Sequence, residues 1–87
     1  MNNQDMTKTL RDYIAQHYAI DAGDPDFTDD VHLFDYGYID SFGAVDLVNF
    51  VQQAFAITIS QSDMVAYPMN TINEIVQFAS LRKQGEL

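Results

Sequence analysis

The strongest local pattern in the chain is the run SFGAVDLVNFVQQAF at 41–55, and it constrains the fold more than any other segment. At the α-helical step of about 100° per residue, most of its apolar residues gather on one side. These residues are Ala44, Leu47, Val48, Val51, Ala54 and Phe55. The opposite side carries polar residues and one aromatic residue, Phe42, while Val45 lies at the edge. The run therefore predicts an amphipathic helix with an exposed ring near its start.

Two capping patterns predict further helices. The segments SQSD at 60–63 and TINE at 71–74 each place an acid three residues after a hydroxyl residue, which is the pattern of a reciprocal capping box. The first predicts a short helix over 61–66, which Pro68 ends. The second opens a last helix with a predicted buried stripe of Ile72, Ile75, Val76, Phe78 and Ala79.

The N-terminal segment predicts a first helix over 3–18. Its helically spaced stripe consists of Met6, Leu10, Tyr13, Ile14, His17 and Tyr18. Asn3 or Asp5 is the expected cap. His17 is interpreted as a packed side chain on this stripe, whereas Lys8 and Arg11 lie off it and are expected to face water.

Residues 19–40 form a long connection between the first two helices. The segment DAGDPD at 21–26 is typical of a turn. Because a structureless loop of this length is unusual in a compact domain, we expect side chains to pin it. The candidates are Phe27, Val31, Leu33, Phe34, Tyr36 and Ile39. We also expect a short helical turn over 30–34 and a turn at Gly37.

Together these segments predict an all-α fold. Four helices, of which the third is short, and a long first loop make a small four-helix bundle. A chain of 87 residues suggests a single domain over 1–87, with a core over about 5–82.

The distribution of charge restricts the partners of the chain. The net charge is −9, the only cations are Lys8, Arg11, Arg82 and Lys83, and residues 12–81 hold eleven acids and no Lys or Arg. Such a surface repels nucleic acid and anionic membranes, because both are polyanions. It attracts proteins that have basic docking patches, and it also keeps a small domain soluble.

Composition excludes several other classes of protein. The chain has no cysteine, so it has neither a disulfide nor a thiolate nucleophile, and two histidines alone cannot complete a zinc-finger type of metal site. No apolar block has the length of a signal peptide or of a membrane span. We therefore expect a soluble, cytoplasmic protein without a metal site.

Ser41 stands at the start of the predicted helix, where a serine can have three roles. Ser or Asp before an apolar run is a common N-cap, worth about 1 kcal/mol. A catalytic serine needs a base and an oxyanion hole, but the only imidazoles are His17 and His32, and His32 has no evident orienting acid. The third role is a seat for a phosphodiester, because free N–H groups and the positive end of the helix dipole stabilise its charge. This role needs no catalytic machinery in the chain.

The segment LFDYGYIDSFGAVDLVNFVQQAFAITIS at 33–60 resembles the core of acyl carrier proteins and peptidyl carrier domains. In that family a D-S-apolar triplet, here Asp40-Ser41-Phe42, opens the second helix. A long loop precedes this triplet, and a short third helix and a last helix with a Thr-apolar start follow it. The resemblance covers about residues 5–82 by element order. It implies a non-catalytic carrier with an acyl-carrier-like fold.

The resemblance also implies the chemistry of the site. Ser41 would carry 4′-phosphopantetheine from coenzyme A, and Asp40 would assist the transfer inside a separate, Mg²⁺-dependent phosphopantetheinyl transferase. The terminal thiol of this arm would hold acyl or aminoacyl groups as thioesters. Ligases or synthases would load these groups onto the arm, and partner enzymes would receive them. The implied carrier is a monomer. Its cargo stays open among fatty-acid, polyketide, nonribosomal-peptide and D-alanyl pathways, because the loading enzymes choose it.

The face of the second helix beside the serine is the expected partner surface. Its residues, together with one from the third helix, are Phe42, Val45, Asp46, Asn49, Gln53 and Met64. The fatty-acid type has a dense acidic second helix, whereas this chain retains only Asp46 there and has Gly43, which weakens a helix. These differences bring the chain closer to stand-alone carriers of secondary pathways, or to D-alanyl and aminoacyl carriers. Met64, Val65 and Tyr67 are interpreted mainly as core.

Two other functions compete with this interpretation. Residues 24–35 match a calcium loop in part, through Asp24, Asp26, Thr28, Asp30, His32 and Asp35. However, Asp29 stands where such a loop needs glycine, Pro25 intrudes, and the last position lacks its glutamate, so we interpret the match as chance. The second alternative is an unmodified acidic adaptor that binds a partner through the face around Phe42.

Overall fold

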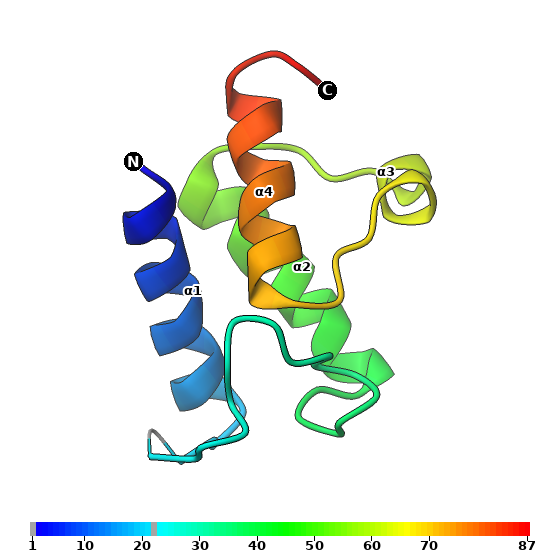
Figure 1. Cartoon of the computed structure of the whole chain (residues 1–87). Helices are drawn as coiled ribbons and strands as arrows, with labels where there is room; N and C mark the ends of the chain where they lie inside the picture. Colours follow the sequence, from blue (N-terminus) through cyan, green and yellow to red (C-terminus); the bar gives the residue numbers. More distant parts are fainter. Residues whose placement is uncertain (1, 22) are drawn as a thin grey trace.

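The chain folds into four α-helices, as the computed structural model of residues 2–21 and 23–87 shows (Figure 1). They are α1 (Asn3–His17), α2 (Ser41–Phe55), α3 (Gln61–Ala66) and α4 (Ile72–Lys83), and no strand occurs in these residues. This confirms the all-α, acyl-carrier-like bundle, with the second and third helices at their predicted bounds. In the predicted turn over 21–26, Ala22 lies outside the described residues.

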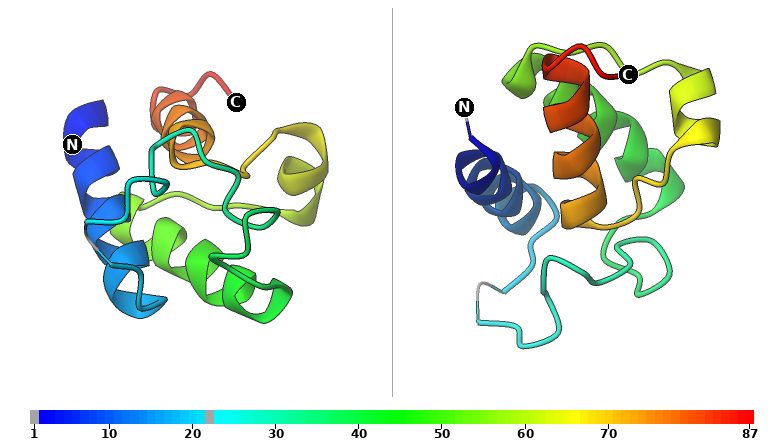
Figure 2. Two further views of the ribbon diagram at one scale, coloured as in Figure 1. Left: turned by 60° about the horizontal axis from the view of Figure 1, so that its bottom comes forward. Right: turned by 45° about the horizontal axis from the view of Figure 1, so that its top comes forward.

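The core lies between α1, α2 and α4, which pack against one another, whereas α3 stands to one side (Figures 1 and 2). Each of the three longer helices contributes a helically spaced row of buried apolar residues, and the loops add four more. The buried set is Met6, Leu10, Ile14, Phe27, Leu33, Ile39, Leu47, Val51, Phe55, Ile59, Ile72, Ile75, Val76, Phe78 and Ala79. The stripe predicted for the last helix is thus confirmed. Among the described residues, no helix is long and apolar enough to cross a membrane.

The starts of the helices follow the capping chemistry of the sequence, with one error. Both predicted capping boxes are present, at the starts of α3 and α4. The predicted caps of α1 are wrong, because the cap is Asn2, whose side-chain oxygen accepts the N–H of Asp5 at 2.8 Å. Asn2 has an extended backbone, whereas Asn3 is already helical.

The long loop is attached to α1 by Arg11. The Arg11 guanidinium donates to Asp29 at 2.8 Å and to the carbonyl oxygen of Phe27 at 3.0 Å, and it lies over the Phe27 ring at 4.5 Å. The expectation that Arg11 faces water is therefore wrong. Its charge is used to hold two loop residues that lie 16 and 18 positions away.

The loop is also attached to the start of α4. The backbone N–H of Asn73 donates to the carbonyl oxygen of Asp29 at 3.0 Å, and its side chain donates to Asp30 at 2.6 Å. The N–H of Leu33 donates to the carbonyl oxygen of Asn70 at 2.9 Å. These bonds hold the loop across the end of the bundle that is opposite both chain ends (Figure 1).

Most of the predicted loop pins are confirmed. Phe27, Leu33 and Ile39 are buried, and Val31 and Phe34 are partly buried against the core. The prediction for Tyr36 is wrong, because its side chain is 54% exposed and stacks on Tyr38. A turn replaces the expected helical turn over 30–34, and it spans 33–37. Gly37 has a φ of +93°, which confirms the predicted turn there.

Candidate functional site

Ser41 is the first residue of α2, and Asp40 is the cap before it. The Asp40 carboxylate accepts the N–H of Gly43 at 2.7 Å, and its carbonyl oxygen accepts the N–H of Ala44 at 3.0 Å. The residue before the cap, Ile39, is only 2% exposed, and its N–H donates to Leu33 at 3.1 Å. The start of α2 is therefore joined directly to the core.

The Ser41 side chain itself is exposed. Within residues 2–21 and 23–87, its hydroxyl makes no hydrogen bond, and the backbone N–H groups of Ser41 and Phe42 have no acceptor. Unpaired N–H groups at the first turn of a 15-residue helix favour a negative charge beside the hydroxyl. The residues present thus fit a phosphodiester on Ser41.

All six residues of the expected partner surface are exposed. The exposed fractions of Phe42, Val45 and Met64 are 84%, 61% and 44%. Val45, Asn49 and Met64 come together at a shallow groove of about 200 Å³ between α2 and α3. Asp46 and Gln53 are exposed on α2 but do not line this groove.

Three of the residues assigned to the core lie at the surface. Met64, Val65 and Tyr67 are exposed, and Val65 is the most exposed of them at 89%, so the core interpretation is wrong. The cause is the placement of α3, which has no buried residue. A six-residue helix that is held at its start leaves most of its surface open to water.

The predicted packing of His17 is confirmed, although the side chain is partly exposed. Its side chain is 44% exposed, and its ring stacks on Tyr13 with a centroid distance of 4.9 Å. The Nε2 atom lies 3.6 Å from the Asp46 carboxylate on α2. His17 therefore packs on the seam between α1 and α2 and not in the core. The other imidazole, His32, accepts the N–H of Asp35 at 3.0 Å.

A small apolar cavity adjoins the groove and shares Ala44, Val48 and Met64 with it. Its volume is about 150 Å³, and its lining comes from the long loop, α2, α3, α4 and the connections on either side of α3. The lining residues are Phe34, Ala44, Leu47, Val48, Val51, Ile59, Met64, Met69, Asn70 and Ile75. The sequence did not point to this cavity, because no spacing rule connects Phe34, Met69 and Asn70 with a face of α2.

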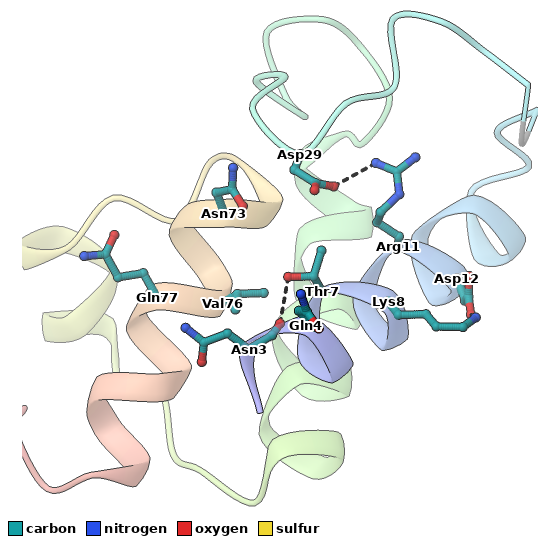
Figure 3. Close-up of a pocket in the computed structure, with 10 residues that line it drawn as sticks. All are labelled: Asn3, Gln4, Thr7, Lys8, Arg11, Asp12, Asp29, Asn73, Val76 and Gln77. Atoms are coloured by element: carbon teal, nitrogen blue, oxygen red, sulfur yellow. Dashed lines mark hydrogen bonds and ion pairs between the residues drawn. The ribbon is translucent and has the colours of Figure 1, made fainter. Parts of the chain in front are cut away.

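A larger hollow lies elsewhere, between α1 and α4 (Figure 3). It has a volume of about 730 Å³, and no residue of α2 or α3 lines it. Its two cations are paired, because Lys8 lies 2.8 Å from Asp12 and Arg11 lies 2.8 Å from Asp29. The start of α2 therefore remains the candidate site, since the cations of this hollow already have partners.

The acids of the partial calcium loop serve separate partners. Asp24 accepts the hydroxyl of Tyr38 at 2.8 Å, and Asp26 accepts the hydroxyl of Tyr36. Asp30 accepts the side-chain N–H of Asn73. Within the described part of the chain, no group of three or more His, Cys, Asp or Glu side chains is placed to hold a metal ion.

The comparisons with known proteins agree with this geometry. The family model described as "Phosphopantetheine attachment site" matches residues 8–79. A D-alanyl carrier protein from Streptococcus uberis (strain ATCC BAA-854 / 0140J) is 38% identical, in an alignment that covers 72% of this chain and 87% of the relative. No solved structure matches significantly. The family match includes the long loop, the start of α2 and most of α4, and the cofactor of this family is 4′-phosphopantetheine. The chain belongs to the phosphopantetheine attachment site family of carrier proteins.

Proposed function

We propose that this protein holds acyl or aminoacyl groups as thioesters on a 4′-phosphopantetheine arm attached to Ser41, and that it delivers them to partner enzymes. The observation that carries this proposal is the exposed Ser41 hydroxyl, free of hydrogen bonds to the described residues, beside two unpaired N–H groups of α2. The family match spans this position.

The attachment is a transfer reaction that another enzyme performs. The Ser41 oxygen forms a bond to the phosphorus that carries pantetheine, and the pyrophosphate P–O bond of coenzyme A breaks. Adenosine bisphosphate leaves, and the hydroxyl proton passes to a base of the Mg²⁺-dependent transferase. This chain presents the oxygen, and the Asp40 carboxylate beside it caps the helix and assists in the transferase complex. The arm then supplies a thiol, which the chain itself lacks.

The partner enzymes bind the face that surrounds Ser41. Phe42 stands out from this face with 84% of its surface exposed, and such a ring is suited to fill an apolar pocket of a partner. Around it the protein is acidic, since residues 12–81 contain no Lys or Arg. We infer partners that combine an apolar pocket with a basic rim. An exposed ring alone would equally suit an unmodified adaptor, so only the serine distinguishes the two functions.

The cargo is a small aminoacyl group. The D-alanyl carrier relative supports this inference. The apolar cavity near the site, of about 150 Å³, is smaller than the roughly 300–1,000 Å³ of pockets that bury drug-sized ligands, so it offers little room for a long acyl chain. Intact-mass analysis of the protein purified from its own host should show the mass of an amino acid added to the arm. A mass that fits only a long fatty acyl chain would contradict this inference.

The attachment is tested by incubating the protein with coenzyme A, Mg²⁺ and a phosphopantetheinyl transferase. We expect a mass gain of one phosphopantetheine per chain, and no gain for Ser41→Ala. The matched control is Ser62→Ala, which removes an exposed serine from α3 and should gain the full mass. Equal gain in Ser41→Ala and in the unchanged protein would exclude Ser41. An unmodified protein in all cases would favour the adaptor.

A further inference from the structure

The residue that caps the C-terminal end of α1 reaches the first turn of α2. This residue is Tyr18, and its hydroxyl donates to the carbonyl oxygen of Gly43 at 2.6 Å. The N–H of the same glycine donates to Asp40 at 2.7 Å. Gly43 is thus held at its carbonyl by α1 and at its amide by the cap, two residues after Ser41.

Gly43 is needed for this contact. A Cβ atom at this position would lie 2.8 Å from Cε1 of Tyr18 and 3.2 Å from Cγ2 of Ile39. Carbon atoms do not approach to 2.8 Å without displacing one another, since their optimal separation is about 3.5–4.0 Å. Glycine weakens the interior of a helix, and here it gives the tyrosine ring direct access to the backbone of α2. The weak helix former and the tyrosine form one structural unit.

Tyr18 is itself firmly placed. Its backbone N–H donates to the carbonyl oxygen of Ile14 at 3.0 Å, which closes α1. Its ring meets His17 edge-on at a centroid distance of 4.8 Å and lies near Tyr13. Burial raises the pKa of Tyr18 to about 12. Like any phenol, its hydroxyl is protonated at neutral pH, and it donates to Gly43.

We propose that Tyr18 is a positioning residue for the modification of Ser41. It fixes the first turn of α2 relative to the rest of the bundle, and thereby fixes the direction in which the serine oxygen projects. The transferase must align that oxygen with a phosphorus atom, and small misplacements of a reacting atom reduce the rate steeply. This inference depends on the proposed attachment at Ser41.

The test compares two variants that each lose one hydrogen-bonded phenol hydroxyl. Tyr18→Phe removes the bond to Gly43, and the matched control Tyr38→Phe removes a bond to Asp24 at 2.8 Å in the loop. We expect Tyr18→Phe to lower kcat for phosphopantetheine transfer by about tenfold with a KM within about twofold of the unchanged protein. Tyr38→Phe should leave both constants within about twofold, although both variants lose a similar amount of thermal stability.

A spectroscopic readout separates positioning from general loosening. In Tyr18→Phe the carbonyl ¹³C resonance of Gly43 should shift, because this carbonyl loses the hydrogen bond from the Tyr18 hydroxyl. The amide resonance of Ser41 should shift with it. Neither resonance should move in Tyr38→Phe. Equal kinetics for the two variants, or an unchanged Gly43 carbonyl in Tyr18→Phe, would overturn the inference.

A double-mutant cycle tests the coupling between the two residues. Gly43→Ala should lower kcat in the presence of Tyr18, because the new Cβ displaces the ring. In a Tyr18→Ala background the same change should lower kcat by a smaller factor, since the ring is absent and only the closer contact with Ile39 remains. Additive effects would contradict a shared role. If Ser41→Ala also accepted phosphopantetheine, the proposed function would fail; if only the effect of Tyr18→Phe were missing, the attachment at Ser41 would stand and the role of Tyr18 would not.

Discussion

The helices α3 and α4 begin with the same chemistry but gain their stability from different sources. Each opens with a capping box, in which a hydroxyl residue and an acid three positions later exchange hydrogen bonds with the backbone. Of the twelve residues of α4, five are buried, whereas none of the six residues of α3 is. A cap therefore determines where a helix begins, and burial determines how firmly the helix is attached.

What holds α3 in place is mainly polar. One carboxylate oxygen of Asp63 accepts the N–H of Ser60 at 2.9 Å, and the other accepts Arg82 of α4 at 2.7 Å. The Arg82 guanidinium also lies over the ring of Phe78 at 5.1 Å, and Tyr67 packs against the same ring at 5.6 Å. We therefore expect α3 to detach from the body at a lower free energy than that of global unfolding.

The largest effect should follow from a cavity in α4. Ile72 has no exposed surface, and Ile72→Ala should lower the free energy of unfolding by about 2–5 kcal/mol. The free energy of unfolding of a domain is only about 0.05–0.15 kcal/mol per residue, so this loss is a large share of the total. Urea denaturation should show a lower midpoint, with fluorescence and circular dichroism changing together. If only α4 unfolded while α1 and α2 stayed folded, the three longer helices would not form one cooperative unit.

A smaller and local effect should follow from loss of the polar attachment. Arg82→Met keeps an apolar stem over Phe78 but removes the charge that Asp63 accepts. Amides of α3 should exchange with solvent about tenfold faster or more, because a hydrogen bond between two charged groups is lost. Amides in the middle of α4 should keep most of their protection. Equal acceleration in both helices would show that α3 and α4 form one cooperative unit.

A fall in pH should weaken the same attachment of α3, because it protonates Asp63. The hydrogen bond from the backbone N–H of Ser60 is the main cause that lowers the pKa of Asp63. The Ser60 side chain and the Arg82 guanidinium lower it further. Since the folded pKa lies below the ordinary value of 3.8, this carboxylate stabilises α3 above pH 3.8, and the contribution is lost as the pH falls through the folded pKa. NMR signals of α3 should change over this acidic range. In Arg82→Met the change should begin at a higher pH, and an unchanged midpoint would contradict the role of Arg82.

The sequence predicted those features that depend on neighbours within a few residues. The bounds of α2 and α3, both capping boxes and the buried stripe of α4 follow from helical spacing and from hydroxyl–acid pairs. The exposure of Phe42 follows from its place on the polar side of α2, since α2 packs on the body with the opposite side. Local rules were sufficient wherever the partners lie within one or two helical turns.

Features that depend on distant partners could not be predicted in this way. Arg11 has no partner within its own helix that would indicate a bond to Asp29, and nothing near Gly43 indicates the ring of Tyr18. The α3 residues were assigned to the core because they are apolar. Six residues are too few for a periodic stripe to show which side is buried, and the attachment through Arg82 lies 19 residues from Asp63.

The smallest effect should come from the apolar surface of α3. Val65 is 89% exposed, and Val65→Ala should change the free energy of unfolding by no more than about 0.5 kcal/mol in either direction. The matched buried change is Val76→Ala in α4, where the side chain is only 4% exposed and its loss leaves a cavity. Thermal denaturation of both variants under one condition gives the comparison directly. If Val65→Ala cost as much as Val76→Ala, α3 would be held by burial after all, and its difference from α4 would be one of degree.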